Sequence, residues 1–409
     1  MTRTLLLVGA GLLQIPAVEV AHELGLHVLA TDRDPHAVAF AHADAAVVLD
    51  TKDVAGHVAL ARELAARGEL AGVYTEGADV EVTVAEAARA AGLPGVDPRA
   101  ARICADKAEF RRVCAAAGLP GPRFREVATL AEAHLALREI GLPVIVKALD
   151  NSGSRGATKV LAAEQLAGAF EEALRWTGGD TVLVEECLSG PEQSVETIVD
   201  QDRVQHRCNI VDRPFAFDPF PIELGHDNPT TLGAHEQQRL YELVEATTSA
   251  VGIDFGAAKA DTIWTSRGPL VLEMTARLSG GFHAQHTSPL AHGTNEIKAT
   301  LELALGRPLD PEHLRRRRHR HAICRALFPE PGLITAIDGV QDALAIDGVE
   351  HVLFRMGVGE QIRPYRTCAD RAGFVIACAD TRERALHAVA EAQRRIVVST
   401  TPGALVGQS

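Results

Sequence analysis

The chain has 409 residues, of which 46% are hydrophobic and 4% aromatic, and its formal net charge is −13. This length suffices for two or three domains whose cores are built mainly from Ala, Val and Leu. The negative charge argues against non-specific binding to nucleic acid or to an anionic membrane, so neither is expected as a partner.

The seven cysteines are scattered and contain no C-x-x-C pair, which favours free thiols in a reducing compartment. The sequence passes from Met1 directly into a strand pattern, without the pattern of a signal peptide. No apolar run is long enough to span a bilayer. These features predict a cytoplasmic protein.

Strand and helix patterns alternate over residues 1–100, which predicts a parallel sheet covered by helices. Within this region, Gly9, Gly11 and Asp32 form half of a dinucleotide-binding fingerprint. Gln14 stands where the third glycine of that fingerprint belongs. An NAD-dependent oxidoreductase therefore stays open only as a minor alternative.

Later elements follow in a mixed order. We expect helices over residues 102–120, 129–140 and 163–176, with a strand hairpin, LPVIVKAL and TKVLA, between the last two. Antiparallel strand pairs begin near residue 194, and a proline-rich loop covers 215–229. After about residue 310, three strand patterns and a final helix predict a separate α+β unit. A basic run at residues 315–321 lies near the beginning of this unit, and we interpret it as a solvated helix end or linker.

The tract KALDNSGSRGATK, residues 147–159, combines small residues with cations directly after an apolar strand. Open backbone amides and positive charge suit a polyanion such as phosphate. An ordinary Gly/Ser hairpin turn is the alternative. Lys147 favours the phosphate interpretation, because a lysine that ends a buried strand is costly without an anion.

The order of several motifs resembles the ATP-grasp superfamily, and within it the L-amino-acid ligases and carbamoyl-phosphate synthetase. The motifs are CADKAEFRRV, PVIVK, NSGSRGA, VEECLSGPEQSVE, KADTIW, VLEMTARLSGG and the tail FPEPGLITAIDG. The resemblance implies a mixed α/β and α+β fold in three parts. These are an N-terminal parallel α/β pre-ATP-grasp domain (1–100), a two-lobed ATP-grasp domain (101–310; lobes at about 120–187 and 188–310) and a C-terminal α+β lid (311–409).

The resemblance also implies a nucleotide site. Lys107 and Lys147 match lysines that contact ATP phosphates, and residues 184–188 match a hinge in which an edge strand meets adenine. Glu192 matches an acid that binds the ribose hydroxyls. The expected ATP-binding residues are Lys107, Lys147, Ser152, Gly153, Ser154, Gly156, Glu185, Glu186, Cys187, Leu188 and Glu192. Surface positions for Glu185 and Glu186 are the alternative.

Asp261 and Glu273 match the carboxylates that hold Mg²⁺ or Mn²⁺ beside the triphosphate, where hard oxygen ligands suit such ions. The family usually has Asn at the position of Thr275, so a second metal position there depends on a shorter side chain. Arg277 resembles the arginine that stabilises the transferred phosphoryl group and, with Lys147, is the expected catalytic residue.

Substrate contacts are expected from Arg277, from Gly280 and Gly281, which permit close approach of the backbone, and from Glu223 and His226 in a loop that resembles the substrate loop of amino-acid ligases. His283 and His286 are weaker candidates. Because no H-x-x-x-H pair with a third ligand occurs, zinc is not expected.

These assignments predict an ATP-dependent carboxylate–amine ligase. An acyl phosphate forms from ATP and a small carboxylic acid, expected to be an amino acid, and an amine then displaces the phosphate. A biotin-carboxylase-like enzyme is the runner-up, and an ATP-binding protein without catalysis is a third possibility. The retention of Asp261, Glu273 and Arg277 argues against the third. A homodimer is possible.

Overall fold

The computed structural model describes residues 3–401, and its first hundred residues form a parallel sheet of strand order β3-β2-β1-β4. Alternate residues of β1 face opposite sides of this sheet. Leu5 and Leu7 pack toward α1 and α10, whereas Leu6 and Val8 pack toward α2 and α3. The elements are β1 (Thr4–Val8), α1 (Ile15–Glu23), β2 (His27–Asp32), β3 (Ala45–Val48), α2 (Val54–Ala66), β4 (Leu70–Tyr74) and α3 (Glu81–Ala90). The predicted parallel α/β domain is confirmed.

Two helices, α4 (Pro98–Ala105) and α5 (Lys107–Ala116), follow where one helix over 102–120 was expected, and that prediction is wrong. Asp106 separates them because its backbone is extended. Its side chain instead accepts hydrogen bonds from the N–H groups of Ala108 and Glu109. The break places Lys107 at the beginning of α5, where its backbone N–H donates to the carbonyl of Leu149.

The small lobe is an antiparallel sheet of order β5-β8-β6-β7, covered by α6 and α7. The hairpin predicted around residues 147–157 is confirmed by the pairing of β6 with β7. The elements are β5 (Phe124–Val127), α6 (Leu130–Ile140), β6 (Val144–Ala148), β7 (Ala157–Val160), α7 (Leu166–Trp176) and β8 (Val182–Glu186).

The large lobe is built on the first strands of an eight-stranded sheet of order β15-β14-β9-β10-β13-β16-β20-β18. The proline-rich stretch 215–229, expected as a loop, contains three short strands, and β13 joins this sheet. The elements are β9 (Glu192–Val199), β10 (Gln205–Arg213), β11 (Phe215–Ala216), β12 (Ile222–Glu223), β13 (Gly225–Asn228), α8 (Ala234–Val251), β14 (Gly256–Thr265), β15 (Gly268–Thr275), α9 (Ser288–His292) and α10 (Glu296–Ala304).

The C-terminal unit shares this sheet. Strands β16, β20 and β18 of the tail continue it beyond β13. A second small sheet, β19-β17-β21, completes the unit. The elements are β16 (His321–Leu327), β17 (Gly332–Asp338), α11 (Val340–Leu344), β18 (Val349–Phe354), β19 (Gln361–Ile362), β20 (Gly373–Ala379), α12 (Arg382–Arg395) and β21 (Val397–Thr401).

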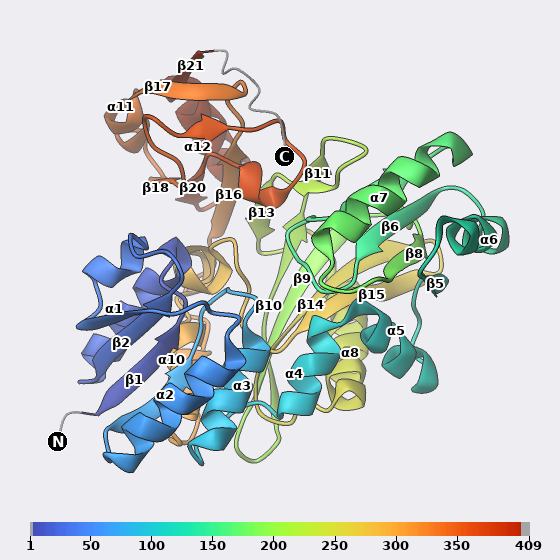
Figure 1. Cartoon of the computed structure of the whole chain (residues 1–409). Helices are drawn as coiled ribbons and strands as arrows, with labels where there is room; N and C mark the ends of the chain where they lie inside the picture. Colours follow the sequence, from blue (N-terminus) through green and yellow to red (C-terminus); the bar gives the residue numbers. More distant parts are fainter. Residues whose placement is uncertain (1–2, 402–409) are drawn as a thin grey trace.

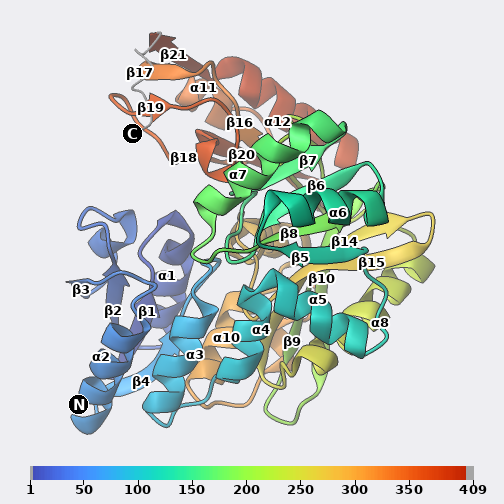
Figure 2. The same cartoon turned by 45° about the vertical axis from the view of Figure 1, so that its right-hand side comes forward.

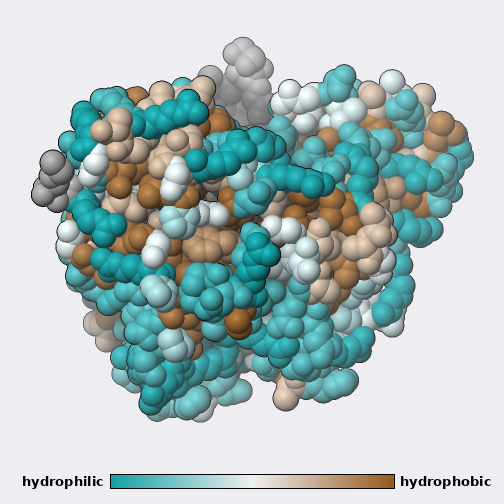
Figure 3. All heavy atoms as spheres, turned by 90° about the horizontal axis from the view of Figure 1, so that it is seen from below, coloured by the Kyte–Doolittle hydropathy of each residue, from teal (hydrophilic) through white to brown (hydrophobic). Residues whose placement is uncertain are grey.

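Figures 1 and 2 show the N-terminal sheet, the small lobe and the C-terminal unit arranged around the long strands β9, β10 and β14. On the face seen from below, hydrophilic residues surround smaller hydrophobic areas (Figure 3). Within residues 3–401, no helix is both long and apolar enough to cross a membrane. All seven cysteines are free thiols, as their spacing predicted.

Gly225 allows β13 and β16 to pair, because a Cβ at this position would lie 2.0 Å from the carbonyl oxygen of Cys324. We expect Gly225→Ala to lower the free energy of unfolding by about 3 kcal/mol or more, through both the clash and its φ of +137°. The control is Gly252→Ala, where φ is +86° and a Cβ would meet nothing within 4 Å; it should cost about 1 kcal/mol. Urea denaturation measures both, and equal losses would contradict the prediction.

Candidate active site

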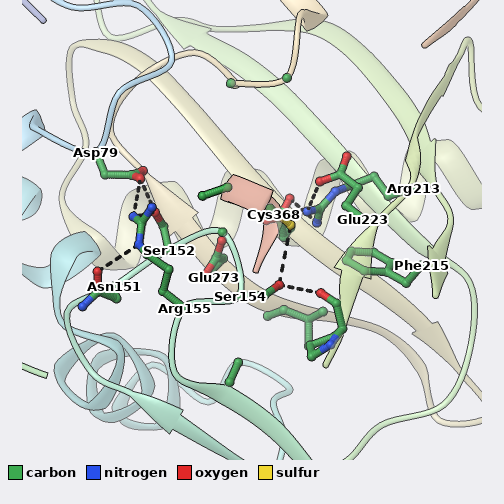
Figure 4. Close-up of a pocket in the computed structure, with 18 of the residues that line it drawn as sticks. Asp79, Asn151, Ser152, Ser154, Arg155, Arg213, Phe215, Glu223, Glu273 and Cys368 are labelled. Atoms are coloured by element: carbon green, nitrogen blue, oxygen red, sulfur yellow. Dashed lines mark hydrogen bonds and ion pairs between the residues drawn. The ribbon is translucent and has the colours of Figure 1, made fainter. Parts of the chain in front are cut away.

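A cavity of about 340 Å³ lies where the two lobes, the N-terminal sheet and the C-terminal unit meet. Its walls carry residues from all four parts. Figure 4 shows Asp79 at one end, Arg213 and Glu223 at the other, and Glu273 and Ser154 between them. Most of the residues that the sequence predicted for ATP, metal and substrate line this cavity.

Lys147 is held at the end of β6 by a buried acid. Its Nζ lies 2.8 Å from Glu185, whose other oxygen accepts a hydrogen bond of 2.6 Å from Nε of Arg111. Burial alone would raise the pKa of Glu185, but Arg111 and Lys147 lower it to about 2. Glu185 therefore stays ionised at neutral pH, and its ion pair with Lys147 holds that lysine at the cavity wall.

The hinge differs from the expectation that an edge strand meets adenine. Strand β8 lies between β5 and β6, so the backbone of Glu185 is already paired on both sides. The side chain of Glu186 contacts Arg267 and Arg123 and does not line the cavity. Beyond the strand, the N–H of Cys187 donates to the carbonyl of Pro143. Cys187 and Leu188, which follow the end of β8, are the positions left for a nucleotide base.

The small-residue loop of residues 151–156 is docked against the rest of the molecule. Ser152 donates a hydrogen bond to Asp79 of the N-terminal domain, and Ser154 Oγ donates one of 2.5 Å to the carbonyl of Pro221. The N–H of Cys368 in the C-terminal unit donates to the carbonyl of Gly153. Gly156 lies outside the cavity, where a Cβ would meet Trp176 at 2.7 Å.

Asp261 and Glu273 lie directly opposite each other on β14 and β15, and both line the cavity. Arg213 and Lys259 lie 2.7 and 2.6 Å from the carboxylate of Asp261. Burial opposes ionisation of Asp261, but these two cations outweigh it and lower its pKa. Two carboxylates on adjacent strands offer the hard oxygen ligands that a divalent cation such as Mg²⁺ prefers.

Thr275 follows Glu273 by two residues on β15, and its side chain lines a second cavity of about 220 Å³ instead of the main one. Glu192, expected at the ribose, does line the main cavity. Burial and the neighbouring charge of Asp261 raise its pKa to about 7, although Arg213 opposes the shift.

Arg277 closes one end of the cavity and forms an ion pair with Asp79. Burial would raise the pKa of Asp79, but Arg277 and the bond from Ser152 lower it. Gly281 lines the cavity with a φ of +79°. A Cβ on Gly280 would lie 3.0 Å from the carbonyl oxygen of Gly77, so this glycine lets the N-terminal domain approach.

Glu223, His226 and His283 come together so that one ligand atom of each lies within 4.8 Å of the others. From the sequence, His283 was only a weaker substrate candidate, and its position beside Glu223 and His226 was not expected. Glu223 already pairs with Arg213 at 2.9 Å, and Nε2 of His226 lies 2.8 Å from Oγ1 of Thr287. Burial is the main cause that lowers the pKa values of both histidines. The neighbouring His283 ring adds to the shift of His226, and Lys259 adds to that of His283, so both rings are neutral. The trio offers one carboxylate and two neutral imidazole rings, which can accept hydrogen bonds from an ammonium group.

Twelve of the predicted residues therefore share one cavity: Lys107, Lys147, Ser152, Gly153, Ser154, Glu192, Glu223, Asp261, Glu273, Arg277, Gly280 and Gly281. The others lie beside it: Gly156, Glu185, Glu186, Cys187, Leu188, His226 and Thr275. Gln14 and Asp32 of the partial NAD fingerprint are also outside it, because Gln14 bonds to Glu76 and Asp32 accepts the N–H of Ala10.

Sequence reasoning missed five charged residues of the lining: Asp79, Arg213, Lys259, Arg355 and Arg371. Two of them carried a usable signal. Asp79 follows β4 at the carboxyl edge of a parallel sheet, where ligands commonly bind. Lys259 lies two residues before Asp261, and therefore on the same face of β14. The three arginines had no local signal.

Two families of known protein domains match parts of the chain. The family described as ATP-grasp domain matches residues 140–285, and the family described as L-amino acid ligase C-terminal domain 2 matches residues 325–401. The chain is 30% identical over 392 residues to the uncharacterized protein y4rH of Sinorhizobium fredii, over 94% of this chain and 80% of that protein.

The D-alanine–D-alanine ligase of Aromatoleum aromaticum is 33% identical over 195 residues, which span 47% of this chain and 62% of that ligase. Among solved structures, the L-amino acid ligase from Bacillus licheniformis has a TM-score of 0.83 at 22% identity, over 98% of this chain and 99% of that one. Phosphoribosylglycinamide synthetase from Anaerococcus prevotii has a TM-score of 0.76 at 20% identity, over 98% and 100%. At these identities the two structures establish a shared fold.

Glu76 is a buried acid behind the Arg277 loop that the sequence did not indicate. It accepts hydrogen bonds from Tyr74 and from Gln285, which also donates to the carbonyl of Ser279. Burial, reinforced by the charge of Glu196, raises the pKa of Glu76 to about 8. The folded protein therefore holds this group neutral at pH values where the unfolded chain ionises it.

Because the pKa of Glu76 is higher in the folded state, its contribution to stability is present at low pH and is lost as the pH rises toward 8. Glu76→Gln removes this loss. Relative to the wild type, we expect the free energy of unfolding of the variant to rise by about 4 kcal/mol between pH 5 and pH 9. Urea denaturation across this range measures it, with Glu242→Gln on the exposed face of α8 as control. A difference that does not change with pH would refute the assignment.

Proposed function

Because the chain belongs to the ATP-grasp ligases, we propose that it joins an amino acid to an amine through an acyl phosphate, releasing ADP and phosphate. The observation that carries the proposal is the convergence of Lys107, Lys147, Asp261, Glu273 and Arg277 on one cavity between the two lobes. Phosphoryl transfer to a carboxylate needs cations that bind the phosphates, carboxylates that hold a metal ion, and an arginine that stabilises the transferred group. This cavity contains all three kinds of residue.

ATP would lie between the lobes, with its base beside Cys187 and Leu188 and its ribose at Glu192. Lys107 and Lys147 would contact the phosphates, under the docked loop of residues 151–156. Asp261 and Glu273 would hold Mg²⁺ or Mn²⁺, which supplies charge neutralisation along the triphosphate. The contacts of Ser152, Gly153 and Ser154 with three other parts of the chain support a closed loop that excludes water from the acyl phosphate.

The amino acid would lie at the other side of the phosphates. Burial would raise the pKa of Glu223, but Arg213 and then Arg371 lower it to about 2, so its carboxylate is ionised. This carboxylate and the neutral ring of His226 would accept hydrogen bonds from the α-ammonium group of the amino acid. The carboxylate of the amino acid would lie beside this ammonium group and face the γ-phosphate, and Arg277 would stabilise the transferred phosphoryl group from the opposite end of the cavity. A carboxylate oxygen then attacks the γ-phosphorus while the bond to the bridging oxygen of ADP breaks. The nitrogen of the amine next attacks the acyl carbon, loses a proton, and expels phosphate.

Hydroxylamine tests the intermediate, because it captures an acyl phosphate as a hydroxamate. With MgATP and pooled amino acids, the wild type should form ADP, phosphate and hydroxamate together, and Glu273→Ala should lower the rate about a hundredfold or more. Glu242→Ala, on the exposed face of α8, should leave it unchanged. Formation of AMP and pyrophosphate would show adenylation. A Glu273→Ala variant that loses only ATP affinity would favour a binding protein without catalysis.

A further inference from the structure

We propose that the amino acid whose carboxylate is activated carries a second anionic group, and that Arg355 and Arg371 of the C-terminal unit recognise it. The inference rests on the proposed function and names the substrate class within it. The anionic group is a side-chain carboxylate or a phosphate, since a guanidinium binds both through paired hydrogen bonds.

The charges of the cavity wall point to a bound anion. Eight cationic and five acidic side chains line the cavity, although the whole chain has a net charge of −13. Six of the eight cations lie within 4.0 Å of a carboxylate; these are Lys107, Lys147, Arg155, Arg213, Lys259 and Arg277. Arg355 and Arg371 are the two cations of the wall with no acidic partner within that distance among residues 3–401.

Arg371 is oriented by neutral groups, and within residues 3–401 its side chain donates hydrogen bonds to backbone carbonyls and not to a carboxylate. It is buried, and its Nε donates a hydrogen bond of 2.7 Å to the carbonyl of Cys368. Its Nη1 donates to the backbone carbonyl of Glu223 at 3.2 Å, and the guanidinium lies 4.9 Å from the centre of the Phe374 ring. A buried guanidinium held in one plane by neutral groups is prepared to receive a planar anion.

Arg355 lies beside Arg371 and shares the same acceptor. Its Nη1 donates to the carbonyl of Cys368 at 3.3 Å, which is the only hydrogen bond of this side chain within the described part of the chain. Arg355 is exposed toward the cavity, yet protein atoms surround its other sides. This burial, and then the charge of Arg371, lower its pKa. An anion between the two guanidinium groups would relieve their repulsion and use the free donors.

The position of this pair favours the amino acid over ATP as its ligand. Arg371 contacts the backbone of Glu223, whose side chain we assign to the α-ammonium group. The lysines assigned to the ATP phosphates belong to α5 and β6, whereas both arginines donate to the carbonyl of Cys368 in the C-terminal unit. A side chain extending from an amino acid at Glu223 would therefore reach Arg371 first.

The first arm of the test compares amino acids that differ in this charge alone or nearly so. Hydroxamate formation is measured with L-glutamate against L-glutamine, L-aspartate against L-asparagine, and O-phospho-L-serine against L-serine. We expect kcat/KM to be about tenfold to a hundredfold higher for at least one anionic member than for its neutral counterpart. The pair that shows this preference identifies the anion as a carboxylate or a phosphate.

The second arm removes one guanidinium. Arg355→Gln is suited to this because the side chain is exposed and forms a single hydrogen bond, so the fold does not depend on it. The variant should lose about tenfold or more in kcat/KM for the preferred anionic substrate, with the KM for ATP and the rate for the neutral counterpart unchanged. Arg363→Gln, at an exposed position outside the cavity wall, should behave as the wild type.

Three results would overturn the inference. They are equal or better use of the neutral amino acids by the wild type, an equal loss for all substrates in Arg355→Gln, and a raised KM for ATP in that variant. If no amino acid forms a hydroxamate, the proposed function fails, and calorimetry decides the inference separately. Binding of an anionic amino acid that weakens in Arg355→Gln but not in Arg363→Gln would support it, and equal binding by all three proteins would refute it.

Discussion

The site depends on the ion pairs that the buried, ionised Glu185 of the small lobe forms with Lys147 and Arg111. One of its oxygens binds Lys147 and the other binds Arg111, whose Nη2 also donates to the carbonyl of Leu272 at 2.6 Å. Leu272 directly precedes Glu273, so this network connects Lys147, which we propose for the phosphates, to Glu273 on the other lobe, which we propose for the metal. Because an unpaired buried charge is so costly, the three side chains keep one arrangement and fix the distance between the lobes.

Asp79 has the corresponding position at the far end of the cavity. It pairs with Arg277 and accepts a hydrogen bond from Ser152, so the N-terminal domain contacts both the proposed catalytic arginine and the loop of residues 151–156 (Figure 4). An anionic substrate would compete with this carboxylate for the same donors. The N-terminal domain, which contributes few residues to the cavity wall, is thereby connected to the loop of residues 151–156.

The C-terminal unit is fixed to the large lobe by a continuous sheet. The pairing of β13 with β16 joins the two, and a glycine at residue 225 is required for it. Consequently Arg355 and Arg371 are presented from a rigid support, and the substrate end of the cavity has a defined shape. Glu223 adjoins β13, so the residue proposed for the ammonium group lies on the same support.

The sequence by itself determined the fold class, most elements and twelve residues of the cavity wall, because hydrophobic periodicity and ordered motifs are local signals. It misjudged the break at Asp106, the strand β13 and the central place of β8, since capping and strand order depend on partners distant in the sequence. Only the tertiary structure decided which charges are compensated. Arg355 and Arg371 resemble any surface arginines in the sequence, and their unpaired state arises from the wall that folding builds around them.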